Sequence, residues 1–251
     1  MSDTLLYPLL FFGALLAGWI DSIAGGGGLI TIPLLLGIGL PPQLALGTNK
    51  FQASFGSFTA AFYYIREGVV ILRDAWAGIF WTFIGAALGT IAVQQIEGSL
   101  LGSIIPFLLL AIAVYTLFTP SLGEKDVHTR MSRNVFCVIF GLSLGFYDGF
   151  FGPGVGSFWA IAYVLGLGYG LRKATGYTKV MNFTSNIVSF GLFVLMGHVW
   201  IAAGLTMAVG QIVGARLGSG MVIKRGAKFI RPVFISIVIL TTLKLLYNRF
   251  V

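Results

Sequence analysis

The sequence predicts an all-α fold: a polytopic helical membrane protein made of two inverted repeats, with broken or re-entrant helices and about eight to ten membrane elements. Three observations predict it. The 251 residues are 57% hydrophobic and only 10% charged, whereas soluble proteins carry about 25% charged residues. The apolar residues form long runs rather than the alternating pattern of membrane β-strands. Short motifs also recur at a separation of about 125 residues.

The low charge excludes several classes of protein. A surface this poor in charge cannot keep a domain soluble, which excludes a soluble enzyme, a disordered chain and a nucleic-acid-binding domain. The net charge of +8 does not reverse this, because nine of the 16 basic residues fall in three short segments. These residues are Arg66 and Arg73; Lys125, Arg130 and Arg133; and Lys224, Arg225, Lys228 and Arg231. Such clusters are typical of the cytoplasmic loops of membrane proteins.

The first half contains five expected elements, at 5–22, 28–40, 44–65, 75–95 and 100–118. A span needs about 20 mostly apolar residues, which every element but the second approaches. The second is short and follows a run of four glycines, where a helix should break. It is therefore expected to be re-entrant or part of a broken helix. No basic region precedes the first element, so a cleaved signal peptide is not expected.

The second half repeats this order, with elements at 134–151, 155–168, 174–197, 200–217 and 230–247. Its short element, 155–168, again follows a break, Gly152-Pro153-Gly154-Val155-Gly156. Gly18-Trp19-Ile20-Asp21 matches Gly145-Phe146-Tyr147-Asp148, and Gly85 and Gly89 match Gly210 and Gly214. We therefore expect a single membrane domain over 1–251, with a first repeat at 5–119, a cytoplasmic linker at 120–133 and a second repeat at 134–248.

The topology follows from the basic loops. Segments 66–73, 120–133 and 219–231 are placed in the cytoplasm, and the turn at Glu97 is placed outside. The counterpart of 66–73 in the second half, near 197–199, then lies outside, while the counterpart of the Glu97 turn lies inside. The repeats are therefore predicted to be inverted, with both chain termini extracytoplasmic. Secondary transporters use this plan, with the substrate site at the midplane between the repeats.

Two lysines inside apolar elements are the main candidates for function, because intramembrane charge is costly and usually functional. Lys50 and Lys179 occupy matched positions in the two halves. Polar residues surround them, and Gln211 is a further candidate to line the cavity. The expected substrate-binding set is Gly25, Gly26, Gly27, Gly28, Thr48, Asn49, Lys50, Gln52, Ser54, Gly152, Gly154, Thr178, Lys179, Asn182, Ser185, Asn186 and Gln211. A cationic pocket with many donors, placed at the starts of helices, suits an oxyanion.

Asp21 and Asp148 are matched acids, each directly before a glycine cluster. Three interpretations stay open. They can couple transport to a proton or cation, act as counter-ions to the lysines, or cap the N–H groups of the short helix that follows.

Enzymatic chemistry is not expected. Gly141-Leu142-Ser143-Leu144-Gly145 matches the nucleophile-elbow pattern, but it lies within an apolar helix rather than a strand-turn-helix. No Cys/His cluster has metal-ligand spacing, and no P-loop sequence is present. No catalytic residue, metal or cofactor is therefore predicted, and an ion gradient or the substrate's own gradient would supply the energy.

The chain resembles a known family. Gly18-Trp19-Ile20-Asp21-Ser22-Ile23-Ala24 with the following glycines, then Leu29-Ile30-Thr31-Ile32-Pro33 and Ala45-Leu46-Gly47-Thr48-Asn49-Lys50, resemble the TauE/SafE sulfite exporter family, also called the 4-toluene sulfonate uptake permease family. Gly145-Phe146-Tyr147-Asp148-Gly149-Phe150-Phe151-Gly152-Pro153-Gly154 is similar to the second signature of its YfcA-like branch. The resemblance implies a multi-pass permease of the bacterial inner membrane for sulfite, sulfonates or other organosulfur anions. The resemblance extends to Asn49-Lys50 and, less closely, to Thr178-Lys179. Pro153 and Val155 differ from the more glycine-rich second cluster that the family pattern leads us to expect.

The predicted function is a secondary carrier for a small, sulfur-containing anion that works by alternating access. Its expected partners are that anion, the lipid bilayer, a coupling proton or cation, and a second copy of the chain in a homodimer. Nucleic acid is not an expected partner. The alternatives are an anion channel and a membrane subunit that transports nothing itself.

Overall fold

The computed structural model describes residues 3–118 and 128–225, and this part of the chain forms nine helices and no strand. The helices are α1 (Asp3–Ala24), α2 (Gly28–Gly37), α3 (Pro42–Arg66), α4 (Leu72–Gln94), α5 (Gly98–Phe118), α6 (Arg133–Phe150), α7 (Val155–Leu167), α8 (Leu171–Leu195) and α9 (Ile201–Arg225). The all-α prediction is confirmed, with helices at nine of the ten expected places. The tenth, at 230–247, lies outside the described residues, so the repeat boundaries stay predictions.

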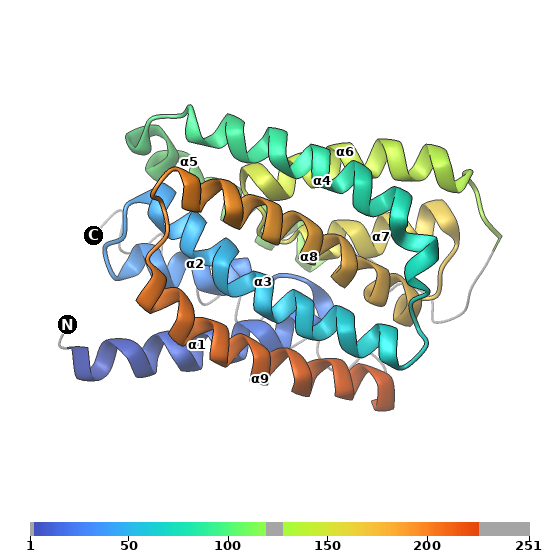
Figure 1. Ribbon diagram of the computed structural model, residues 1–251, viewed down its shortest axis with the longest axis horizontal. Helices are drawn as coiled ribbons and strands as arrows, with labels where there is room; N and C mark the ends of the chain where they lie inside the picture. Colours follow the sequence, from blue (N-terminus) through green and yellow to red (C-terminus); the bar gives the residue numbers. More distant parts are fainter. Residues whose placement is uncertain (1–2, 119–127, 226–251) are drawn as a thin grey trace.

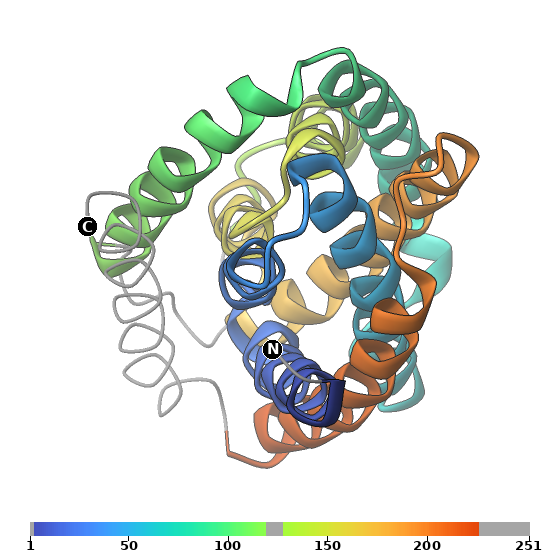
Figure 2. The same cartoon turned by 90° about the vertical axis from the view of Figure 1, so that its left-hand side faces the viewer.

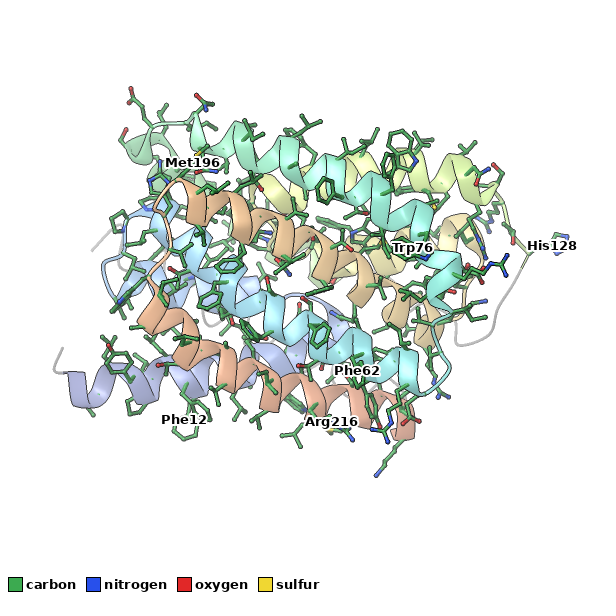
Figure 3. The ribbon with its side chains drawn as sticks, in the orientation of Figure 1. Phe12, Phe62, Trp76, His128, Met196 and Arg216 are labelled. Atoms are coloured by element: carbon green, nitrogen blue, oxygen red, sulfur yellow. The ribbon has the colours of Figure 1, made fainter. Side chains whose placement is uncertain are left out.

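The exterior is that of a membrane protein. Within the described residues, three segments are long and apolar enough to cross a bilayer: Leu5–Ala24, Leu72–Gln94 and Ile201–Lys224. Large apolar side chains point outward, including Phe12, Phe62 and Trp76, each more than half exposed (Figure 3). An exposed apolar surface of this extent is stable only against lipid or a partner. The helices therefore belong to a membrane-embedded bundle.

Corresponding helices of the two halves run in opposite directions. In Figure 1, α1, α3 and α9 run away from the end that holds the N-terminus, whereas α6, α8 and α4 run back toward it. The repeat pairs α1 with α6, α3 with α8, and α4 with α9, so each pair is antiparallel, as inverted repeats require. The packing is matched too, because α1 packs along α9 and α4 packs along α6.

Glycines make this packing close. A Cβ at Gly89 would collide with the carbonyl of Phe146, and a Cβ at Gly214 would collide with the carbonyl of Leu15. Small residues let helix backbones approach in this way inside membranes. The matched glycines of the sequence are thus packing residues of two equivalent helix contacts.

Helices α1 and α2 form one hairpin, and α6 and α7 form a second. The α1–α2 hairpin begins and ends at the N-terminal end of the bundle (Figure 1). At the opposite end, the segment before α6 lies against the end of α7, where the Arg130 amide donates to the Gly166 carbonyl at 3.1 Å. Each hairpin therefore enters and returns at one end, which makes the short helices re-entrant rather than spanning. Figure 2 shows α2 and α7 near the centre of the bundle.

The two hairpin tips meet inside the molecule. The Ser157 hydroxyl donates to the carbonyls of Ala24 and Gly25, each at 3.0 Å. Gly25 has a φ of +72°, a conformation that favours glycine, and it packs directly on the backbone of Gly156. The glycine clusters thus serve both to turn the chain and to let one tip lie against the other.

Basic residues gather at one end of the bundle. The α3–α4 turn, the end of α9 and the start of α6 all lie at the end opposite the N-terminus (Figure 1). Arg66 ends α3, Arg133 begins α6, and Lys224 lies in the last turn of α9. The turn at Glu97 lies at the other end. This charge asymmetry agrees with the distribution that the positive-inside rule uses.

Candidate functional site

A small polar cavity lies where the hairpin tips meet α3 and α8. Its volume is about 30 Å³, and both halves of the chain contribute to it. The lining residues are Asp21, Gly27, Gly28, Asn49, Lys50, Gln52, Ala53, Asp148, Gly152, Val155, Asn182, Asn186 and Gln211. This volume exceeds the roughly 10–15 Å³ that one water needs but is far below the roughly 300 Å³ of the smallest ordinary ligand pockets. The site in this conformation is therefore too small for an ordinary ligand.

Two ion pairs, each with a buried lysine, hold the halves together across this site. Lys50 on α3 pairs with Asp148 on α6, with Nζ 2.5 Å from Oδ1. Lys179 on α8 pairs with Asp21 on α1, with Nζ 3.1 Å from Oδ2. Both lysine side chains are at most 2% exposed. Each lysine of one half thus takes its counter-ion from the other half, as buried charges require a partner.

Each lysine also holds the backbone at the end of the helix that carries its acid. Lys50 Nζ donates to the Asp148 carbonyl oxygen, and Lys179 Nζ donates to the Asp21 carbonyl oxygen. These carbonyls lie near the helix C-termini at the breaks, where the dipole favours a cation, and the Asp21 carbonyl also accepts from the Gly25 amide at 2.9 Å. The lysines therefore stabilise both the acid and the break in the helix.

The two acids differ in their other partners. Oδ1 of Asp21 accepts from the amides of Gly26 and Gly27, at 2.9 and 3.1 Å. This carboxylate is therefore both a counter-ion and an acceptor that holds the glycine turn before α2. Oδ2 of Asp148 instead accepts from the Ser185 hydroxyl on α8. Each acid thus pairs with a lysine, whereas no side chain caps the N-terminus of α2 itself.

Amide side chains complete the cavity wall. Oδ1 of Asn49 accepts from the Thr31 hydroxyl at 2.5 Å and from Nε2 of Gln52 at 2.9 Å. Its oxygen is therefore occupied, which leaves its NH₂ group as the part that can face a ligand. Oε1 of Gln52 and Oδ1 of Asn182 are buried and have no hydrogen-bond partner among the described residues. The wall thus offers the lysine and amide donors together with two free acceptors.

Of the predicted site residues, eleven line the cavity. They are Asp21, Gly27, Gly28, Asn49, Lys50, Gln52, Asp148, Gly152, Asn182, Asn186 and Gln211. The remaining eight do not line it: Gly25, Gly26, Thr48, Ser54, Gly154, Thr178, Lys179 and Ser185.

The residues outside the lining have structural contacts of their own. The Thr48 hydroxyl accepts from the Trp200 amide at 2.9 Å. The hydroxyls of Ser54 and Thr178 donate to the helix carbonyls of Lys50 and Ala174. Such back-bonding satisfies a hydroxyl that faces apolar surroundings. Ser185 and Lys179 act on the site through the two acids rather than from its wall.

Three residues near the site were not predicted. Ala53 and Val155 line the cavity, and Thr31 orients Asn49. Ala53 and Val155 are apolar and carry no signal of their own. Thr31 lies one helical turn after the first glycine cluster. This position at the start of a short helix is the sequence feature that could have identified it as a site residue.

These features define a class: a helical membrane protein with a small polar site between two inverted hairpins. The comparisons with known proteins agree with it. Residues 10–245 match the model of the family "Sulfite exporter TauE/SafE", and the chain belongs to that family, which is one of membrane transporters. The resemblance seen in the motifs is thereby confirmed.

Close relatives carry transporter names. The chain is 48% identical over 244 residues to a "Probable membrane transporter protein" of Haemophilus influenzae, covering 97% of this chain and 96% of the relative. It is 48% identical over 248 residues to the "Probable membrane transporter protein YfcA" of Escherichia coli K12, covering 99% and 92%. It is also 33% identical over 131 residues to "Sulfite exporter TauE/SafE family protein 5" of Arabidopsis thaliana, covering 51% and 28%.

Proposed function

We propose that this chain is a secondary carrier of the bacterial inner membrane for a small oxyanion of the sulfite and sulfonate class. One observation carries the proposal: a buried lysine, Lys50, faces a small polar cavity whose wall comes from both inverted halves. An ammonium group with amide donors suits an oxyanion. The family name supports sulfite or a related sulfur anion as the substrate.

The small size of the cavity favours a carrier over a channel. With about 30 Å³ of space, the site cannot hold a sulfonate until the hairpin tips move apart. At the point where Gly25 lies on Gly156 the tips meet through backbone rather than large side chains, and we propose that the two halves separate there. Rocking of one repeat against the other would open the site to one side at a time.

The first test is a thermal-stability screen of the purified protein in detergent. The panel contains sulfite, methanesulfonate and sulfoacetate, with acetate and malonate as the matched carboxylates. A ligand at about 100 times its dissociation constant adds about 2.7 kcal/mol to the free energy of unfolding. We expect this stabilisation from the sulfur anions and not from their carboxylate analogues. Equal stabilisation by both sets would contradict sulfur specificity. Fast flux without saturation or counterflow in liposomes would instead support a channel.

The orientation is tested by cysteine labelling. The sequence has one cysteine, Cys137, so Cys137→Ser provides an unlabelled background. In it, we expect Glu97→Cys to react with a membrane-impermeant maleimide on intact cells, and Arg130→Cys to react only after permeabilisation. Both native side chains are exposed. The turn between α4 and α5, which holds Glu97, lies at the opposite end of the bundle from the segment before α6, which holds Arg130 (Figure 1). The reverse pattern would place the basic end outside and contradict the proposed topology.

A further inference from the structure

We infer that Asp148 occupies the anion's place beside Lys50 while substrate is absent, and that it leaves Lys50 as a neutral acid when the anion binds. Asp148 then carries the coupling proton, while the Lys179–Asp21 pair stays closed. This inference rests on the proposed transport function and assigns its coupling group. Three independent features of the site support it: which pair faces the cavity, which acid can hold a proton, and how the charges balance.

The two ion pairs differ in their access to the cavity. Lys50 and Asp148 both line it, whereas of the other pair only Asp21 does. Lys179 is fully buried and faces Asp21 alone among the acids of the described residues. An anion in the cavity can therefore reach Lys50 directly, and it meets Asp148 as the group already bound there. Lys50 keeps the Asp148 backbone carbonyl as a partner when the carboxyl group moves away.

The two acids also differ in their ability to become neutral. Oδ1 of Asp21 faces two backbone N–H groups, which can only donate and so require a charged or unprotonated oxygen. Oδ2 of Asp148 faces the Ser185 hydroxyl. A hydroxyl rotates and can accept as well as donate. A protonated Asp148 can therefore donate to Ser185. Asp21 would have to carry its proton on Oδ2, which faces the Lys179 ammonium at 3.1 Å, a group that can only donate.

The charge balance requires the proton. With the site empty, the Lys50 ammonium and the Asp148 carboxylate sum to zero. A monovalent anion that entered alone would leave one uncompensated negative charge in a buried site, which is strongly unfavourable. If the Asp148 carboxylate takes one proton from the aqueous side that is open, the ammonium, the anion and the neutral acid again sum to zero. One anion and one proton then cross together, and no covalent bond changes apart from the O–H bond.

No other charged group of the described residues competes for this role at Asp148. From α3 the acid faces Lys50, and from α8 it faces Ser185, while Lys179 is held by Asp21. On α4, the charged residue that contacts α6 is Asp74. Its Oδ1 lies 2.9 Å from Nη1 of Arg133 at the basic end of the bundle. Helix α7 contains no charged residue. His198 lies in the turn between α8 and α9, with Nδ1 3.4 Å from Oε1 of Gln94, and makes no contact with the Lys50–Asp148 pair.

The test compares two buried serines. Ser185→Ala removes a hydroxyl whose hydrogen bond is stronger to a charged carboxylate than to a neutral acid, so the pH dependence of transport should move. Ser57→Ala is the matched control, because the buried Ser57 hydroxyl donates only to the helix carbonyls of Ala53 and Ser54. Wild type and both variants are reconstituted in liposomes, and counterflow of labelled methanesulfonate is measured with equal pH on both sides. Methanesulfonate takes up no proton near neutral pH.

We expect counterflow to fall as the pH rises, because the neutral acid is required. Ser185→Ala should move this limb upward by about one pH unit, and Ser57→Ala should leave it in place. The comparison can be repeated with sulfite. Any proton uptake by sulfite itself is the same for wild type and both variants, so a difference between their pH profiles comes from the protein. Unshifted limbs in both variants would overturn the assignment of Asp148. Wild-type protein that exchanges neither anion would instead overturn the proposed function.

A second measurement needs no variant. With the membrane potential clamped at zero, an inward proton gradient should accumulate methanesulfonate about tenfold for each unit of pH difference in wild-type liposomes. Varying the potential at a fixed pH difference should not change this ratio, because the cotransport is electroneutral. Accumulation that follows the potential and ignores the proton gradient would overturn the inference while leaving the carrier intact.

Discussion

Replacing Lys50 with methionine is expected to abolish transport and to lower the free energy of unfolding by about 3–5 kcal/mol. The cost arises because Asp148 remains buried with no cation beside it, and the side chain of Lys50 is only 2% exposed. Methionine keeps the approximate volume, so loss of packing is a minor part. Stability is measured by unfolding in detergent, and transport is measured by counterflow of sulfite and methanesulfonate.

A double variant separates the fold from the function. Lys50→Met with Asp148→Asn removes both charges, so most of the lost stability should return, since an uncharged pair leaves no buried ion. Transport should stay absent, because the cation that binds the anion is gone. Lys224→Met, at an exposed position in the last turn of α9, serves as the control for loss of a lysine. Wild-type counterflow in the double variant would contradict the role of Lys50 in anion binding.

Gly156→Ala is expected to cost about 1–3 kcal/mol of stability and to stop transport. A Cβ at this position would lie 2.5 Å from the Cα of Gly25, so the two hairpin tips must separate to admit it. Gly27 and Gly152 belong to the same tips and line the cavity, so separating the tips also changes the cavity wall. Stability in detergent and counterflow in liposomes measure the two effects.

The matched control is Gly191→Ala on α8. A Cβ there meets nothing within 4 Å, and alanine should favour the helix by up to about 1 kcal/mol. If Gly156→Ala does not fold, Ser157→Ala tests the same contact more gently, because it removes only the hydrogen bonds to Ala24 and Gly25. Unchanged counterflow in both tip variants would show that the tip contact has no part in transport.

Much of the fold follows from local sequence signals. Long apolar runs predict the helices, because a bilayer requires every backbone group to bond within its own segment. The glycine clusters predict breaks before α2 and α7, and the structure has them. The lysines and acids stand out as candidates because a charge in an apolar helix is costly without a function or a partner.

The partners of those charges could not be read from the sequence. Lys50 and Asp148 are 98 residues apart, and Lys179 and Asp21 are 158 residues apart. Matched motifs show that the two halves are equivalent, but they do not show whether a lysine pairs within its own half or with the other. The ion pairs cross between the halves because the hairpin tips meet at the centre of the bundle. Each acid therefore lies against the long helix of the other half.

What the sequence by itself determined is therefore the order of the described helices, the two breaks, the duplicated motifs and the charged residues that stand out as candidates, all of which depend on composition and spacing along the chain. Only the tertiary structure decided that the short helices return to their own end, that the ion pairs cross between halves, and that Asp148 faces Ser185. The ion pairs and the Asp148–Ser185 contact join segments more than 30 residues apart, and their free energies depend on geometry in space and leave no pattern in the local sequence.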